Sequence, residues 1–202
     1  MFKTLVNAFK IEELRKRMFY TFWILIVVRL GSLLPIPGVD LSQAREYLQS
    51  VLGGTNSFID SFTGGSFASM SAFALSVTPY ITASIIMQLL TIAIPAIEEM
   101  HRDGEDGRKK IQKITRYVSV GLAVLESSGL ALGFSRQGAL GETNFLTIFT
   151  IIVTLTTGSC IIMWLGERIT EKGIGNGISM ILLINILSGI PRDFLSLYNQ
   201  FM

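Results

Sequence analysis

Long apolar runs alternate with short polar segments along most of the chain. Each run approaches the ~20 residues that a helix needs to cross the hydrocarbon core of a bilayer. The pattern predicts an all-α polytopic membrane protein with five transmembrane helices. The predicted spans cover residues 18–34, 72–96, 117–134, 145–165 and 178–197.

Residues 1–17 precede the first run and place Phe2, Leu5, Val6 and Phe9 at helical spacing. This pattern is typical of an amphipathic helix lying on the membrane surface. A cleaved signal peptide is the alternative. The run 18–34 contains Arg29, leads into Pro35 and lacks a small-residue cleavage site, so we expect a retained first span. We expect the Arg29 side chain to snorkel to the headgroups.

The stretch between the outer loop 35–55 and the second span is too interrupted to cross lipid alone. Residues 56–71 mix aromatic side chains with Asp60, Gly64 and Gly65. Non-helical backbone at membrane depth must be buried in protein or line a water-filled cavity. The pattern predicts a short re-entrant helix, and we expect Pro79 to interrupt the following span near its start.

Composition supports the membrane class and narrows the chemistry. Half of the residues are hydrophobic and 16% are charged, with a mean hydropathy of +0.52. Cys160 is the only cysteine and His101 the only histidine. These counts argue against a disulfide framework, a thiolate metal cluster or histidine-based catalysis.

The net charge of +2 is small, but the cations are distributed unevenly between loops. By the positive-inside rule, the loops richest in Lys and Arg face the cytoplasm. This predicts a cytoplasmic amino terminus and external positions for the 56–71 segment, the loop 135–144 and residue 202. The cation-rich segments are 1–17, 97–116 and 166–177, and the other loops hold Arg45, Arg136 and Arg192.

Two further features admit alternatives. Glu126 lies near the centre of the third span, either as a protonated or hydrogen-bonded carboxyl facing the bundle or as part of a proton relay. The glycine-rich stretch WLGERITEKGIGNGIS lacks the G-x-x-x-x-G-K-[ST] spacing of a phosphate loop. We therefore expect no nucleotide binding, and we expect Asn176 to cap the fifth helix.

This stretch, together with PYITASIIMQLL and PIPGVD, closely resembles the bacterial SecY family, the channel-forming subunit of the Sec protein translocon. The resemblance implies one five-helix half of an inverted-repeat channel, with residues 198–202 beginning the linker to a second half. It also implies a plug on the outer side, formed by residues 56–71. The aromatic and glycine positions of that plug are Phe58, Ile59, Phe62, Gly64, Gly65 and Phe67.

The resemblance further implies a ring of aliphatic side chains at mid-membrane and a lateral gate along the second span. An apolar ring binds no passing side chain strongly and resists ions by dewetting. The residues alone favour lipid-facing or bundle packing for the ring positions, and it is the resemblance that assigns them to a pore. The ring positions are Val77, Ile81, Ile178 and Leu182, and the gate positions are Ser84, Ile85 and Gln88.

The implied setting is the bacterial cytoplasmic membrane, and no cofactor is expected. The implied partners are SecE, SecG, the motor ATPase SecA or a translating ribosome, signal peptides, nascent polypeptides, membrane lipids and the second half of the subunit. The basic loops either are simply solvated or contact the ribosome or SecA. The candidate contact residues are Arg102, Arg108, Lys109 and Lys110.

Three functional classes follow from the sequence. A protein-conducting channel explains the re-entrant segment and the aliphatic candidates. A secondary transporter for a small solute also uses inverted repeats and broken helices, but it needs polar ligands at the midplane, where Gln88 and Glu126 are the candidates. A membrane-embedded enzyme is disfavoured, because no nucleophile with a base, carboxylate pair or metal site is apparent.

Overall fold

The computed structural model describes residues 11–40, 42–44, 46, 60, 62–136, 138 and 144–201. Side chains 192, 193, 195–197 and 199–201 lie outside that description. The described part of the chain is all-α, apart from an isolated antiparallel bridge between Pro35 and Ser71. Its helices are α2 (Glu12–Gly31), α5 (Thr78–Ala93), α6 (Pro95–Arg102), α7 (Glu105–Arg136), α8 (Phe145–Lys172) and α9 (Gly177–Phe201).

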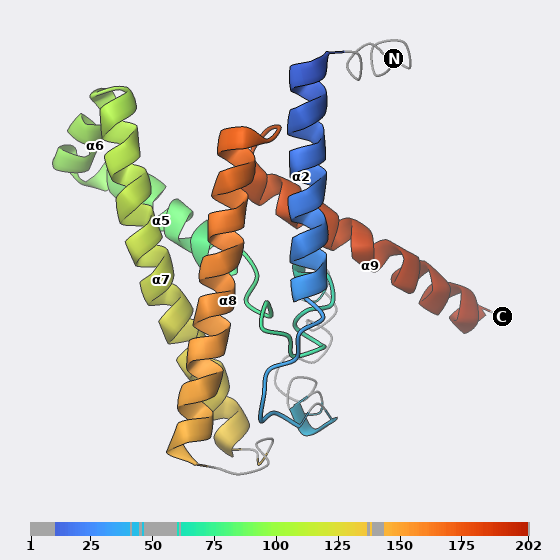
Figure 1. Cartoon of the computed structure of the whole chain (residues 1–202). Helices are drawn as coiled ribbons and strands as arrows, with labels where there is room; N and C mark the ends of the chain where they lie inside the picture. Colours follow the sequence, from blue (N-terminus) through green and yellow to red (C-terminus); the bar gives the residue numbers. More distant parts are fainter. Residues whose placement is uncertain are drawn as a thin grey trace.

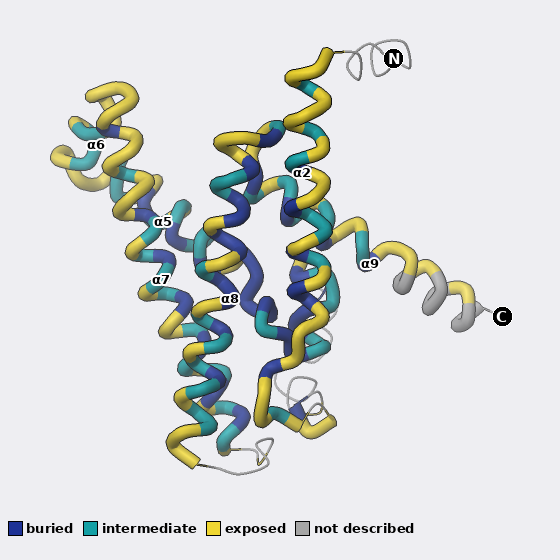
Figure 2. The backbone as a smooth tube through the Cα atoms, in the orientation of Figure 1, coloured by how far each residue is buried: buried dark blue, intermediate teal, exposed yellow. Residues whose placement is uncertain are grey.

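Helix α8 lies at the centre of the helix packing. It packs along α7 on one side and contacts α2 and the start of α9 on the other, while α5 packs against α7 (Figure 1). The carboxyl-terminal part of α9 extends away from the other helices. Buried residues are concentrated where α8 faces the segment that leads into α5 (Figure 2).

Two helices, α7 and α8, are long and apolar enough to cross a membrane. Helices α5 and α6 pass the same test as a pair, although they meet at an angle of 102°. The apolar part of α9, Gly177–Pro191, is shorter. The described residues therefore contain two or three such helices, and the total of five spans stays a prediction.

The second predicted span differs from the observed one at both ends. Residues 72–77 form turns, and α5 begins at Thr78, so Pro79 occupies the first turn and does not interrupt the helix. Proline is tolerated there because first-turn N–H groups have no intrahelical partner. The other end is at Ile94, whose backbone is extended before Pro95 starts α6.

The basic segments 97–116 and 166–177, predicted as loops, are largely helical. Helix α6 and the first turns of α7 fill most of the former, and α8 continues to Lys172 in the latter. Oppositely charged side chains three or four residues apart support these exposed turns. Arg102 pairs with Glu98, and Arg168 pairs with Glu171.

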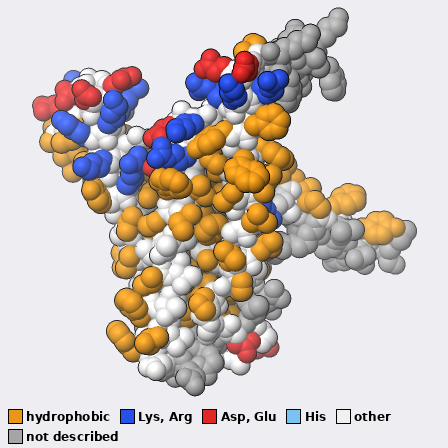
Figure 3. Space-filling model, in the orientation of Figure 1, with side chains coloured by type: hydrophobic (Ala, Val, Ile, Leu, Met, Phe, Trp, Pro, Cys, Tyr) orange, Lys and Arg blue, Asp and Glu red, His pale blue; other side chains and the backbone are white. Residues whose placement is uncertain are grey.

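Charged side chains gather at one end of the molecule, whereas the sides are covered largely by apolar side chains (Figure 3). The start of α2, the α6–α7 junction and the end of α8 all lie at this end (Figure 1). The described parts of the three cation-rich segments therefore lie at one end of the molecule, and the cytoplasmic position of that end stays a prediction. Arg102, Arg108, Lys109 and Lys110 are exposed there.

The buried apolar residues form two clusters. The α7–α8 cluster lies where these helices pack on the loop after α2 and on residues 67–75. The α2–α8–α9 cluster lies where those three helices meet residues 73–77. Fully buried members of the α7–α8 cluster include Met70, Phe134, Ile151 and Leu155, and those of the α2–α8–α9 cluster include Val28, Val77, Ile162, Ile169 and Ile181.

A glycine in α8 allows the non-helical backbone before α5 to approach closely. A Cβ atom at Gly158 would lie 1.9 Å from the carbonyl oxygen of Ala72. The next residue, Ser159, donates a hydrogen bond of 3.3 Å to the carbonyl oxygen of Ser76. Residues 72–77 are thus held directly against the middle of α8.

We predict that Gly158→Ala destabilises the full-length protein, because the added methyl group would collide with the Ala72 carbonyl. Overpacking typically costs about 1–3 kcal/mol, and each kcal/mol lowers the melting temperature by about 2–4 °C in a domain of 150–250 residues. Thermal unfolding in detergent measures the effect. The control is Gly121→Ala on the exposed face of α7, where a Cβ meets no atom within 4 Å. Equal melting temperatures for both variants would contradict the close approach.

Candidate functional site

The four predicted ring residues come together at the junction of α5 and α9. Val77 is buried within the α2–α8–α9 cluster, and Ile81, Ile178 and Leu182 pack against that cluster. Val77 and Ile81 lie just before and within α5, and Ile178 and Leu182 lie in α9. The structure thus gives one shared apolar site at positions far apart in the sequence.

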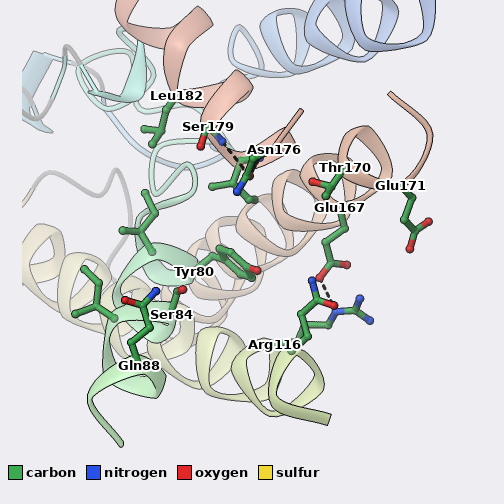
Figure 4. Close-up of a pocket in the computed structure, with 14 residues that line it drawn as sticks. Tyr80, Ser84, Gln88, Arg116, Glu167, Thr170, Glu171, Asn176, Ser179 and Leu182 are labelled. Carbon is green, nitrogen blue, oxygen red and sulfur yellow. Dashed lines mark hydrogen bonds and ion pairs between the residues drawn. The ribbon is translucent and has the colours of Figure 1, made fainter. Parts of the chain in front are cut away.

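A cleft of about 420 Å³ adjoins this apolar site. Ile81, Ile178 and Leu182 form part of its wall. Polar side chains from α5, α7, α8 and the start of α9 line the remainder, as Figure 4 shows. The cleft therefore combines aliphatic and polar walls from four helices.

An ion pair joins two of the helices that line the cleft. Arg116 of α7 donates from Nε to the Oε1 atom of Glu167 of α8 (Figure 4). The Glu167 side chain is only 13% exposed, so water screens the pair less than an exposed surface pair. The sequence does not indicate this pair, because the two residues are 51 positions apart.

The predicted gate residues lie along the same cleft. Ser84, Ile85 and Gln88 all line it from α5, at the spacing of one helical face. Ser84 is half-buried, whereas Ile85 and Gln88 are exposed. The described part of the chain thus leaves Ile85 and Gln88 uncovered on this face of α5. The role of this face as a gate stays a prediction.

The glycine-rich stretch forms the tight connection from α8 to α9. The Asn176 side chain accepts hydrogen bonds from the backbone N–H groups of Ile178 (3.1 Å) and Ser179 (3.4 Å), which confirms the predicted cap. A Cβ atom at Gly177 would lie 1.8 Å from the carbonyl oxygen of Gly166. The glycines thus permit a close contact of the two helices beside the cleft.

The described part of the predicted plug consists of residues 60 and 62–71, and Phe58 and Ile59 lie outside the described residues. Its backbone is mostly turns, with positive φ at Gly64 and Gly65. Phe67 is buried in the α7–α8 cluster, away from the ring residues, and Phe62 is 39% exposed. The expected re-entrant helix is therefore replaced by turns over most of this part.

Arg29 does not take the orientation expected from snorkelling. Its Nη1 atom donates a hydrogen bond of 3.2 Å to the carbonyl oxygen of Gly64. A Cβ atom at Gly64 would lie 2.6 Å from that Nη1 atom and 3.0 Å from the Ser188 hydroxyl of α9. Glycine is therefore required at position 64 because α2 and α9 both pack closely against it. The sequence alone does not indicate this requirement.

A buried polar contact at the centre of the molecule was also missed. The Asn185 side chain of α9, 3% exposed, donates a hydrogen bond of 3.1 Å to the Ser76 hydroxyl. Ser76 has φ +49°, which an ordinary L-residue rarely adopts. Asn185 thus joins Gln88 and Glu126, the polar residues that the sequence places within the predicted spans. An asparagine within an otherwise apolar helix was the available signal.

Glu126 borders a second, apolar groove of about 350 Å³. The groove lies between α7 and the segment leading into α5, with Thr63, Phe67 and Leu75 among its walls. Glu126 therefore lies on the side of α7 that borders this groove, and its protonation and role stay a prediction. The described part of the groove presents no second carboxylate or histidine to it.

The chain matches the SecY protein family over residues 71–202. The protein translocase subunit SecY of Corynebacterium glutamicum is 38% identical over 200 residues, which cover 94% of this chain and 46% of that protein. The SecY subunit of Escherichia coli strain K12 is 43% identical over 183 residues, covering 89% of this chain and 41% of that protein. The chain thus spans about half the length of the relatives it matches.

Solved structures show the same fold. Sec61 in the canine ribosome–channel complex from the endoplasmic reticulum aligns with a TM-score of 0.58 and 21% identity, over 87% of this chain and 37% of that chain. A second structure, described as a protein-conducting channel, aligns with a TM-score of 0.57 over the same shares. At this identity the likeness establishes the arrangement of the helices.

The helical fold, the apolar sides and the gathering of charge at one end define an all-α polytopic membrane protein. Within that class, the match over residues 71–202 is decisive. The chain belongs to the SecY family.

We predict that Asn185→Leu destabilises the full-length protein by about 1–2 kcal/mol, because Ser76 would lose its partner in a buried site. Thermal unfolding in detergent measures the loss. Leu183→Ile, on the exposed face of the same helix, is the control for a change of apolar shape. An Asn185→Leu variant as stable as the control would show that the hydrogen bond to Ser76 contributes nothing.

Proposed function

We propose that this chain forms half of a protein-conducting channel that moves secretory polypeptides across the bacterial cytoplasmic membrane. The observation that carries the proposal is the meeting of Val77, Ile81, Ile178 and Leu182 in one apolar site beside the cleft. A polypeptide contains every type of side chain, so fixed charges at a constriction would retain some segments. Aliphatic side chains retain none strongly, and they dewet when no polypeptide is present.

The cleft serves in this proposal as the approach to the constriction. It is lined by polar groups of α5, α7 and α8 and by aliphatic groups of α5 and α9, among them Ile81 and Leu182. A hydrated chain entering here keeps its polar groups solvated until it reaches the ring. The segment of residues 60–71 then closes the channel beyond the ring, as the plug.

The polar and apolar side chains along α5 support a lateral gate in the same proposal. Ser84, Ile85 and Gln88 lie on a face that an apolar signal sequence would reach through the cleft. Gln88 donates or accepts a hydrogen bond across the closed gate. Its partner belongs to the second half of the subunit, and SecE, SecG and membrane lipids complete the channel.

The driving energy comes from a partner, SecA or a translating ribosome, or from the membrane potential. Four exposed cations at the charged end of the molecule are secondary contacts for that partner: Arg102, Arg108, Lys109 and Lys110. In this arrangement the charged end and the amino terminus are cytoplasmic, and residue 202 is external. The chain works by gating a path, without catalysis of its own.

A solute transporter is the second candidate, because Asn185, Ser76 and Glu126 add polar groups inside the bundle. Asn185 and Ser76, however, bond to each other in a buried position, 3% and 2% exposed. A substrate would have to break this contact to use them. The geometry therefore favours the channel, and solute uptake by the reconstituted protein would favour the transporter.

We predict that Ile178→Ser and Leu182→Ser raise the resting ion conductance of the complete channel several-fold, because a hydroxyl at the ring retains water. Planar-bilayer recordings of the full-length protein with its partner subunits measure the conductance. The matched control is Leu183→Ser, adjacent in α9 but 52% exposed on the outside. The channel proposal fails if the ring variants conduct no more than this control.

We also predict that Gln88→Leu changes export of a reporter carrying a defective signal sequence by about threefold, the factor expected for one interhelical hydrogen bond in a membrane. Export of a reporter with an intact signal should change less. Gln112→Leu is the control, because Gln112 lines the same cleft from α7. Unchanged export in the Gln88 variant would remove this residue from the gate.

A further inference from the structure

The described part of the plug segment is bonded within itself. The Asp60 side chain accepts a hydrogen bond of 3.0 Å from the backbone N–H of Ala68, and its carbonyl oxygen accepts one of 2.9 Å from Gly65. The Thr63 hydroxyl and the Ser69 hydroxyl make further bonds inside the same segment. These bonds link residues 60 and 62–69 into one hydrogen-bonded unit.

The unit is attached to the loop after α2 at its carboxyl-terminal end. Ile36 donates to the carbonyl oxygen of Met70 (3.0 Å), and Ala72 donates to that of Leu34 (2.8 Å). Met70 itself has φ +46°. Residues 70–72 therefore form a fixed pivot, and residues 60–69 lie on one side of it.

Arg29 reaches the unit away from this pivot. It lies in the last turn of α2, where a cation is favoured by the helix dipole. Its Nη1 atom bonds to the carbonyl oxygen of Gly64, at a turn that is packed against Ser188 and Asn185 of α9. The guanidinium thus holds the unit between α2 and α9.

The energetics of this bond depend on the absence of water. A guanidinium stays charged at any physiological pH, and an unsolvated charge or backbone carbonyl at membrane depth is costly. If the unit leaves its site, Arg29 loses the Gly64 carbonyl and that carbonyl loses Arg29. Once water fills the proposed channel, it can solvate both the Arg29 guanidinium and the Gly64 carbonyl. The bond between them therefore favours the closed position most strongly when the channel holds no water.

We infer that Arg29 is a positioning residue that holds the plug in its closed position through the Gly64 carbonyl. This inference deepens the proposed function and rests on it for the identity of the plug. Arg29 touches no part of a translocating polypeptide in this scheme. It sets how readily residues 60–69 leave the site between α2 and α9.

The test measures exposure of the plug directly. In the full-length protein with its partner subunits, Ser66→Cys is introduced into a background without other cysteines, which includes Cys160→Ser. Ser66 is 2% exposed. The labelling rate with a membrane-impermeant maleimide is then compared for Arg29, Arg29→Lys and Arg29→Met. Arg17→Met, at the charged end of the same helix, is the matched control.

We expect Arg29→Met to raise the labelling rate at position 66 about tenfold, the effect of losing a hydrogen bond to a charged group. Arg29→Lys should lie between Arg29→Met and the unchanged protein, because it keeps the charge and a donor. A thiol introduced by Ser119→Cys, buried in α7, reports general loosening. The inference is wrong if labelling at position 66 is unchanged, or if it rises equally at position 119.

Deleting residues 60–69 separates this inference from the proposed function. We expect the deletion to raise the resting conductance, and we expect Arg29→Met to add nothing in the deleted protein. If the deletion variant conducts no more ions at rest than the unchanged channel, the plug assignment is wrong, and the labelling result still stands. A leaking deletion variant, combined with unchanged labelling in Arg29→Met, would disprove only the role of Arg29.

Discussion

Non-helical backbone in a membrane must find its hydrogen-bond partners within the protein, and residues 64–77 are such a stretch. Their partners come from every side. Arg29 of α2 bonds to the Gly64 carbonyl, Ser159 of α8 to the Ser76 carbonyl and Asn185 of α9 to the Ser76 hydroxyl. The helices are thus arranged around a stretch that could not exist in lipid without them.

The same stretch explains why the two apolar clusters lie where they do. Its first half contributes Phe67 and Met70 to the α7–α8 cluster, and its second half contributes Phe73 and Val77 to the α2–α8–α9 cluster. Glycine at position 158 brings its backbone onto α8. The proposed constriction forms at its end, where Val77 leads into α5 and meets α9.

Hydropathy and charge predicted the class, the helical content and the gathering of three cationic segments at one end, because these follow from the cost of burying polar groups in lipid. The Asn176 cap was predictable because it is local. Arg29 and Asn185 were not, since their partners are distant in sequence and depend on how α2 and α9 pack. The ring positions were implied by a family resemblance. That they pack at one apolar cluster could be seen only in the folded structure. The helix in 97–116 was missed because exposed turns rely on ion pairs instead of apolar patterning.

The bend at Ile94 forms a nearly right-angled corner between α5 and α6. Helix α6 leaves α5 at 102° and packs against α7 at the charged end. Ile81 lies 13 residues from Ile94, a distance of about 20 Å along the helix. A swing of the α5 axis by about 5° about this corner therefore displaces Ile81 by about 2 Å, roughly the size of a methyl group. The corner at Ile94 therefore places Ile81 where a small change in the angle between α5 and α6 would have its largest effect on the apolar site.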